Sequence, residues 1–256
     1  MIDRRCALLL LAATPVLARA QDTGGDPFGS LQWPGLRREF FGDAPVVFDE
    51  RVQVRGPGFA EDPMNVPIGV SAAALADVQS LVVFVDRNPI RKVLELTPLA
   101  ALPAISFRFK LEQASPVRAA ARTKDGVWHV GGTLVDSSGG GCTVSGASRQ
   151  DGSWAQTLGQ VSGKVFDASP APGVAGSRLR LRVMHPMDTG LVGGVPAFYV
   201  RQLALRDAAG TELLRLATFE PVSENPVFSF DFPGRVGPLH LSGSDNNGNR
   251  IDARLE

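Results

Sequence analysis

The chain has 256 residues, and its 44% share of hydrophobic side chains is typical of a globular protein. Its 26 basic and 26 acidic residues balance, so there is no overall charge to attract nucleic acid or an anionic membrane. The length suits one large domain or two ordinary ones.

Residues 1–20 have the features of a secretory signal peptide. A pair of arginines precedes an apolar run over residues 7–17, and a small-x-small cleavage site ends at Ala20. The apolar run is too short to span a bilayer, and its flanks are those of an export signal. Cleavage would remove Cys6, so we expect Cys142 to be the only cysteine of the mature chain.

The mature chain would keep roughly 235 residues with a net charge near −2. We expect a soluble periplasmic protein, and the arginine pair leaves both the Sec and the twin-arginine routes open. No later segment holds 18 uninterrupted apolar residues, so no membrane span is expected. A single cysteine can form neither an internal disulfide nor a Cys-x-x-Cys redox pair.

The first segments after the cleavage site are a leader and a helix. Residues 21–34 begin with a stretch rich in Gly, Asp and Pro, and we expect a disordered leader there. Residues 33–41 predict one short helix, because Pro34 falls in its first turn and Leu36 and Phe40 lie on one side.

Residues 35–136 predict a first β domain. The clearest strand is 105–112, where apolar and polar residues alternate strictly, as in a strand with one buried face. Residues 81–85 are apolar throughout and predict a central strand covered on both faces. A tight hairpin turn is expected at Asp125 and Gly126, because glycine supplies a positive φ.

Residues 177–256 predict a second β domain. Its apolar and polar residues again alternate, with leucines and arginines over 178–183 and phenylalanines over 228–232. The run 245–249 superficially resembles a calcium loop, but Arg250 stands where that motif requires glycine, so a hairpin turn is expected instead. Short strands broken by Gly, Asn, Asp and Pro indicate an all-β fold of antiparallel β-sandwiches.

Residues 137–176 predict a flexible Gly/Ser/Pro-rich arm and linker between the two domains. They contain few large apolar side chains, so they bury too little apolar surface to offset the entropy of ordering. Within them Cys142 follows Gly139, Gly140 and Gly141. We expect a flexible glycine arm with an exposed thiol that sweeps on the order of 15 Å.

An exposed lone thiol predicts a group carrier. No lysine, histidine or helix N-terminus near Cys142 in sequence would lower its pKa, so activation is expected to come from a partner enzyme. The alternatives are a disulfide-linked dimer through Cys142 and an incidental exposed thiol.

Other polar residues give weaker predictions. A triad of Cys142, His185 and Asp188 would make a thiol hydrolase, but His185 and Asp188 flank a proline in the other block. We expect them to be loop residues instead. His129 and His240 fall in strands and are expected to face solvent. No histidine spacing resembles a metal site, and we expect neither metal nor cofactor.

Five short motifs lie in the two β blocks. The second block contains HPMDTG at 185–190, PVSENP at 221–226 and SDNNG at 244–248. The first contains VDRNPI at 85–90 and the glycine-flanked Cys142 after its last strand. With these motifs the first block resembles SoxY and the second SoxZ, so the chain resembles a fused SoxY–SoxZ sulfur carrier.

The resemblance implies immunoglobulin-like β-sandwiches in both halves. It also implies that Cys142 is the covalent attachment site for sulfur intermediates, that separate periplasmic sulfur-oxidising enzymes act on them, and that the carrier itself catalyses nothing. Fused chains of this kind form a subgroup associated with quinoprotein alcohol dehydrogenases. In SoxY the cysteine lies in GGCGG at the extreme C-terminus, whereas here Thr143 and Val144 follow it. An arm held at both ends explores less volume.

Two functions therefore remain in competition. The first is a periplasmic carrier of sulfur-containing groups on Cys142. The second is an accessory or interaction protein of a periplasmic quinoprotein dehydrogenase, in which the sandwiches mediate contact and Cys142 is dispensable.

Overall fold

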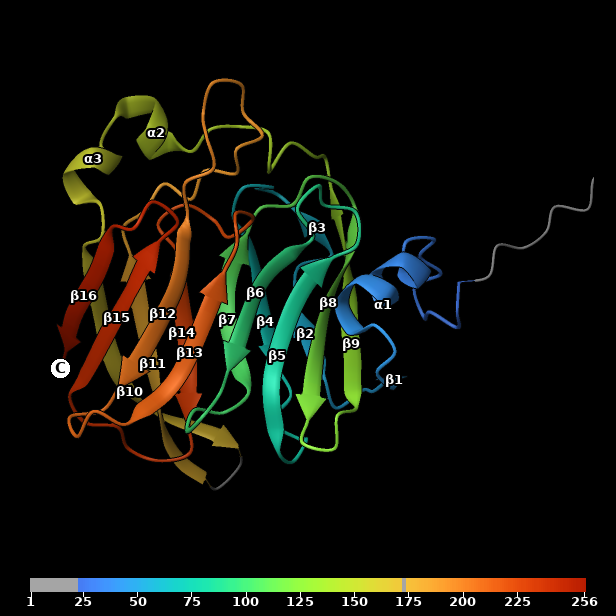
Figure 1. Cartoon of the computed structure of the whole chain (residues 1–256), viewed down its shortest axis with the longest axis horizontal. Helices are drawn as coiled ribbons and strands as arrows, with labels where there is room; N and C mark the ends of the chain where they lie inside the picture. The colour runs from blue at the N-terminus through green and yellow to red at the C-terminus, as the bar shows by residue number, and fades with distance from the viewer. Residues whose placement is uncertain (1–22, 172–173) are drawn as a thin grey trace, which may run out of the picture.

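The computed structural model describes residues 23–171 and 174–256, so the expected signal peptide at 1–20 lies outside the described residues. The expected all-β fold is confirmed, because two sheets pack face to face over most of the described chain (Figure 1). Each half of the chain contributes strands to both sheets, so each half forms a sandwich-like arrangement.

One sheet has ten strands and the other six. The first runs in the order β1 (Val46–Phe48), β9 (Trp128–Ser137), β8 (Ser115–Thr123), β5 (Val78–Val85), β6 (Lys92–Thr97), β13 (Glu212–Thr218), β12 (Val200–Arg206), β15 (Leu239–Asp245) and β16 (Arg250–Leu255), and β3 (Phe59–Ala60) pairs with β9. The second runs in the order β10 (Val161–Ala171), β11 (Val174–Val183), β14 (Val227–Phe232), β7 (Ala104–Phe109), β4 (Val66–Ser71) and β2 (Gln53–Arg55).

Both sheets continue from the N-terminal half into the C-terminal half. In the larger sheet β6 pairs antiparallel with β13, with Leu96 opposite Leu216. In the smaller sheet β7 pairs with β14, with Ile105 opposite Phe230. The facing apolar rows of the two sheets form a core cluster with members from both halves, so the halves share their backbone pairing and their interior.

The strongest periodicities of the sequence are confirmed as strands. β7 and β14 alternate buried with more exposed residues, because successive side chains of a strand point to opposite faces. In β5, Leu81 and Val83 face the main core, while Val82 and Phe84 face a second cluster. The strand is therefore covered on both faces, as predicted. The β8–β9 hairpin turns at Asp125 and Gly126, where Gly126 has a φ of +85°.

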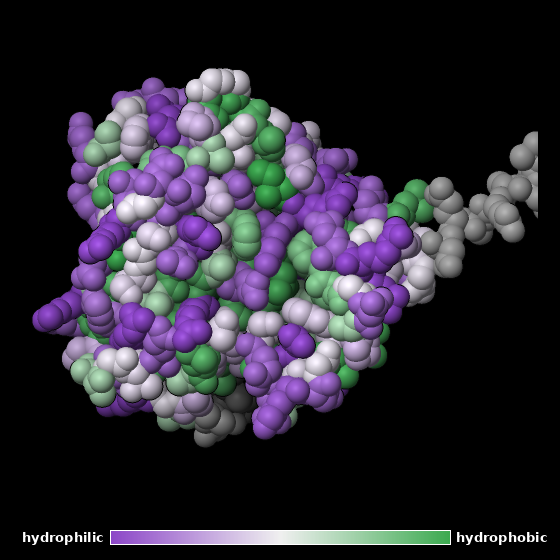
Figure 2. Space-filling model, in the orientation of Figure 1, coloured by the Kyte–Doolittle hydropathy of each residue, from purple (hydrophilic) through white to green (hydrophobic). Residues whose placement is uncertain are grey.

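Helix α1 (Trp33–Phe41) is also confirmed and forms the cover over β5. Trp33, Leu36 and Phe41 are buried on the outer face of the larger sheet, and Phe40 stacks on Phe84 with ring centroids 4.3 Å apart. Pro34 lies in the first turn, where no backbone donor is needed. The face of the molecule that Figure 2 shows is largely hydrophilic, with smaller hydrophobic areas among the hydrophilic residues.

The described part of the leader does not behave as predicted. Asp26 is 7% exposed, accepts a backbone hydrogen bond from Ser30 and pairs with the buried guanidinium of Arg118. Phe28 lies over the same guanidinium. The polar composition that predicted disorder is therefore compatible with order here, because one buried cation on β8 holds the segment.

The linker prediction for 137–176 is also wrong in its structural part. Two short helices, α2 (Ala147–Asp151) and α3 (Trp154–Thr157), precede β10, which is the edge strand of the smaller sheet. An edge strand pairs along one side only and keeps one row of backbone groups exposed. Strand β10 therefore needs few large apolar residues, and Val161 and Val165 pack against the core.

Among the described helices, none is both long and apolar enough to cross a membrane.

Candidate functional site

Cys142 is buried, contrary to the expected exposed thiol. Its exposed fraction is 0%, and its Sγ donates a weak hydrogen bond to the Lys110 carbonyl oxygen at 3.6 Å. The contacts that bury it come from distant parts of the chain, the end of β7 and the loop around Thr189. Local composition could not reveal these contacts.

The three glycines before Cys142 dock against the chain that leaves β7. The Gly140 and Gly141 backbone amides donate to the carbonyl oxygens of Glu112 and Leu111, at 3.2 and 3.3 Å. A Cβ on Gly141 would overlap the carbonyl oxygens of Pro63 and Leu111. Gly139 has a φ of +93°, which favours glycine. These glycines therefore permit a close backbone approach, and the expected free arm is docked along residues 110–112.

Two side chains hold the cysteine backbone from opposite sides. The Glu112 carboxylate accepts a hydrogen bond from the Cys142 amide at 2.9 Å and another from the Thr143 hydroxyl at 3.1 Å. The Thr189 hydroxyl donates to the Cys142 carbonyl oxygen at 2.6 Å. Glu112 belongs to the N-terminal half and Thr189 to the C-terminal half, so the cysteine is held between the two halves.

Residues 145–149 are held in a similar way. The Glu224 carboxylate accepts from the Ser148 amide at 2.8 Å, and a Cβ on Gly146 would overlap the same carboxylate. Arg149 pairs with Asp188, and its guanidinium lies 4.2 Å from the ring centroid of Trp154. The segment on both sides of Cys142 is therefore closed onto the body of the protein.

Burial makes the thiol unreactive in this arrangement. Burial and the nearby Glu112 carboxylate together raise the pKa of Cys142 to about 12, although the Lys110 ammonium opposes them. Because the thiolate is the nucleophilic form, the docked cysteine resists oxidation and does not attack a substrate. An intermolecular disulfide at Cys142 would require this segment to open.

Lys110 is the least expected neighbour of the cysteine. Strict alternation placed it on the polar face of a strand, but β7 ends at Phe109 and Lys110 is only 2% exposed. Its ammonium donates to the Met187 carbonyl oxygen. Burial lowers the pKa of Lys110, while interactions with Cys142, Asp188 and Glu224 favour its charged form. Its ammonium is the positive charge that opposes the rise in the pKa of Cys142.

The structure brings the 185–190 loop to the cysteine without forming a hydrolase triad. His185 Nδ1 accepts the Met187 amide at 3.1 Å, and Nε2 lies 3.5 Å from an Asp245 carboxylate oxygen. Burial lowers the pKa of His185 to about 4, although Asp245 opposes this shift. Both ring nitrogens are directed at groups other than Cys142, so His185 is not placed as a base for the thiol.

The remaining predictions about polar residues are resolved by local contacts. His240 is exposed, as predicted, and pairs with Asp252, whereas the same prediction is wrong for His129, which is largely covered and lies 2.7 Å from Asp49. Asp245 accepts the amides of the hairpin turn that follows it, so the 245–249 run is a turn, as predicted. Over residues 23–171 and 174–256, no group of three or more His, Cys, Asp or Glu side chains could hold a metal.

Sequence reasoning missed Glu112, Lys110 and Thr189. Glu112 and Lys110 were counted as the polar face of a strand, and only the end of β7 at Phe109 turns them toward the cysteine. The sequence did single out the segment that contains Thr189, because this residue lies in the HPMDTG motif. That motif gave no hint of its contact with Cys142.

Comparison with known proteins places two families on the chain. Residues 37–142 match the family of the sulfur oxidation protein SoxY, and residues 171–256 match that of the sulphur oxidation protein SoxZ. The search of curated proteins finds no match. Among solved structures, the sulfur carrier protein SoxY from Chlorobium limicola f thiosulfatophilum is similar, with a TM-score of 0.37 and 16% sequence identity over 42% of this chain and 96% of that chain. The chain therefore belongs to the SoxY and SoxZ families, which are joined here in one polypeptide.

Proposed function

We propose that this protein is a periplasmic carrier that bears a sulfur-containing group covalently on Cys142 and presents it to partner enzymes. The observation that carries the proposal is the position of this residue. Cys142 is the only cysteine in the described part of the chain, and the SoxY match ends on it. This position supports Cys142 as the cargo cysteine that the resemblance to SoxY implies.

The docked segment is then the resting state of the carrier. Loading requires the contacts of Glu112 and Thr189 with the cysteine backbone to break, after which the thiol pKa returns toward its ordinary value of about 8.5. A sulfur–sulfur bond between Cys142 and an incoming sulfur anion releases the thiol proton and two electrons. The loading enzyme has to accept those electrons.

The partners that fit this role are periplasmic sulfur-oxidising enzymes or a quinoprotein dehydrogenase system. The carrier itself is proposed to be non-catalytic, because His185 Nδ1 accepts the Met187 amide and Nε2 lies nearest to Asp245, at 3.5 Å, so neither nitrogen is placed to activate Cys142. In this account the chemistry takes place in the partner, and the carrier supplies the thiol.

A second candidate is an accessory protein of a quinoprotein dehydrogenase in which Cys142 has only a packing role. The observation that favours it is the burial of the thiol, with the pKa raised to about 12. Most buried free cysteines behave as small hydrophobic residues.

Complementation of a deletion strain separates the two candidates. Growth is measured on reduced sulfur compounds and on alcohols with wild type, Cys142→Ser and the neighbouring control Val144→Ala, with equal protein levels checked by immunoblot. The carrier account expects Cys142→Ser to behave as the deletion and Val144→Ala as wild type. Full growth of Cys142→Ser would support the accessory role and overturn the carrier role.

A further inference from the structure

The outer face of the six-stranded sheet carries a cluster of basic side chains. Arg178, Arg180 and Arg182 alternate along β11 with buried residues and are exposed, as is Arg108 on β7. Lys164 on β10 and Arg55 on β2 extend this face to the two edge strands. We call these six side chains the basic face.

The strand register places the basic face across both halves of the chain. One cross-strand row runs in the order Lys164, Arg180, Ser229, Ser106, Gly69 and Arg55. The row crosses from Arg180 to Arg55 over four strand spacings, roughly 19 Å. Neither half alone would present this face, because β10, β11 and β14 come from one half and β7, β4 and β2 from the other.

Most of these charges have no acidic partner. Arg178 pairs with Asp231 at 2.7 Å. Among the described residues, Arg108, Arg180 and Arg182 form neither an ion pair nor a side-chain hydrogen bond, and Lys164 lies over the Phe166 ring. Glu224 borders the basic face at one end, and its carboxylate accepts a hydrogen bond from the Ser148 amide. The face is therefore strongly positive on a protein with no net charge.

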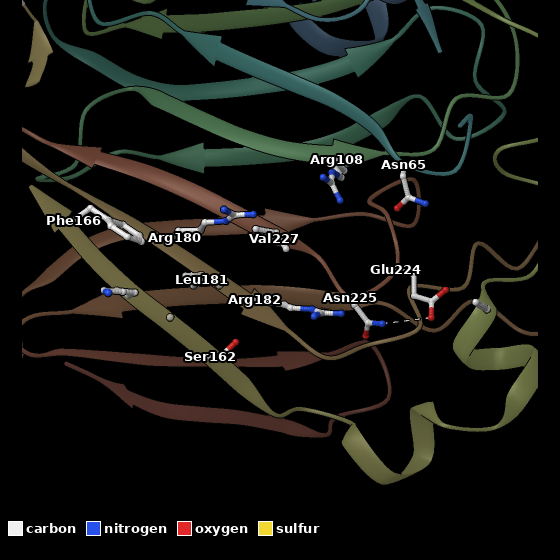
Figure 3. Close-up of a pocket in the computed structure, with 13 residues that line it drawn as sticks. Asn65, Arg108, Ser162, Phe166, Arg180, Leu181, Arg182, Glu224, Asn225 and Val227 are labelled. Atoms are coloured by element: carbon white, nitrogen blue, oxygen red, sulfur yellow. Dashed lines mark hydrogen bonds between the residues drawn. The ribbon is translucent and has the colours of Figure 1, made fainter. Parts of the chain in front are cut away.

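The sheet surface between the arginines carries small side chains. Ser162, Ser106, Gly69 and Ser229 lie where larger side chains would fill the space, and two adjoining hollows of about 710 and 650 Å³ share Arg108, Phe166, Arg180 and Val227. Figure 3 shows Arg108, Arg180, Arg182 and Asn225 around the first hollow. The arginines therefore border an open trough that another surface can enter.

The trough ends beside the cysteine segment. Its first hollow is bordered by Ala147, Glu224 and Asn225, and Glu224 holds the Ser148 amide at 2.8 Å. Ala147 is five residues after Cys142 in the chain. A protein seated in the trough would therefore contact the segment that keeps the thiol closed.

We propose that the basic face is the docking surface for an acidic face of a partner protein. A single small anion forms ion pairs only within about 4 Å of each charge, so it cannot bridge a row that extends over roughly 19 Å. A protein surface with several carboxylates can, and complementary charge of this kind speeds encounter and selects the partner. That this partner is the enzyme that loads Cys142 rests on the proposed function, whereas acidic docking itself does not.

The test measures binding of a fluorescein-labelled oligoglutamate by anisotropy at low salt and at about 0.15 M salt, where the Debye length is about 8 Å. The variant is Arg180→Glu with Arg182→Glu. The matched control is Arg201→Glu with Arg250→Glu, which changes the net charge equally at exposed positions of the ten-stranded sheet. Circular dichroism confirms that both fold. Oligoglutamate binding is also measured with Cys142→Ser, which tests docking without the proposed cargo cysteine.

We expect the Arg180 and Arg182 reversals to weaken oligoglutamate binding by about tenfold or more, with the control within about twofold of wild type and Cys142→Ser equal to wild type. Added salt should weaken the wild-type complex. Equal binding by both reversed proteins would overturn the proposal. So would displacement of oligoglutamate by millimolar thiosulfate or sulfate, which indicates a small-anion site, or a stronger preference for a DNA strand of equal charge.

Discussion

Arg118 is a fully buried cation that is matched on two sides. Its guanidinium binds both oxygens of Asp86 and both oxygens of Asp26, at 2.6 to 2.9 Å. The rings of Phe28 and Trp33 lie 5.0 and 4.6 Å from it. Burial disfavours the charge, but the two carboxylates outweigh this and raise the pKa of Arg118.

Arg118→Met is expected to lower the free energy of unfolding by about 3–5 kcal/mol, because it leaves two carboxylates buried without a cation. The control Arg91→Met removes an exposed pair with Glu39 and should change stability by no more than about 1 kcal/mol. Urea unfolding at neutral pH measures both. Equal effects of the two substitutions would contradict the role given to Arg118.

His185 makes stability depend on pH. Burial lowers its pKa from 6.5 to about 4, so the unfolded chain binds the proton more tightly than the folded chain. Stability is then greatest above pH 6.5 and falls as the pH drops toward 4. Between pH 7.5 and 5.0, this residue should lower the free energy of unfolding by about 2 kcal/mol.

His185→Asn, whose side-chain oxygen can accept the Met187 amide, should remove that part of the pH dependence. His240→Asn serves as the control, because His240 is exposed. Urea unfolding of the three proteins at both pH values gives the comparison. An unchanged slope in His185→Asn would show that His185 is not the buried neutral group described here.

The docked cysteine segment is the element on which function depends. With the pKa of Cys142 raised to about 12, maleimide at pH 8.5 should label native protein about a thousandfold more slowly than urea-unfolded protein, because so little thiolate is present. Thr189→Val removes the hydrogen bond to the Cys142 carbonyl, a loss of about 1 kcal/mol, so native labelling should become about fivefold faster.

The control for this labelling experiment is Thr211→Val at an exposed position, which should label as wild type does. Native labelling as fast as unfolded labelling would mean that the thiol is free. The segment would then be the open arm expected from its composition.

Local patterns predicted the most regular elements correctly, and non-local contacts account for the miss at Cys142. Alternation identified β7, β11 and β14, and helical spacing identified α1, because those signals lie within a few neighbouring residues. The burial of Cys142 depends on Lys110, Glu112 and Thr189, which are at least 30 residues away in the chain. Composition around a cysteine cannot report such partners.

At the scale of the whole molecule, the SoxY-like and SoxZ-like halves form one continuous pair of sheets. The sequence predicted two sandwiches joined by a linker, because the boundary between the blocks contains few apolar residues. The cross-pairing of β6 with β13 and of β7 with β14 joins them by backbone hydrogen bonds. Such pairing leaves little trace in sequence, since edge and central strands can have the same alternation.

Continuous sheets predict one cooperative unfolding transition for both halves. Leu216→Ala, at the β13 side of the joint where Leu216 is 1% exposed, should shift that transition by about 2–5 kcal/mol without splitting it. Urea unfolding followed by both tryptophan fluorescence and circular dichroism is the measurement. Two separate transitions in wild type would show that the halves fold independently.

The most direct test of the carrier account is the intact mass of the protein purified without reductant from its native host. During growth on a substrate that requires the protein, the account predicts a sulfur-containing adduct that maps to the Cys142 peptide, is released by thiol reductant and is absent from Cys142→Ser. An unmodified Cys142 thiol under every growth condition that requires the protein would contradict it.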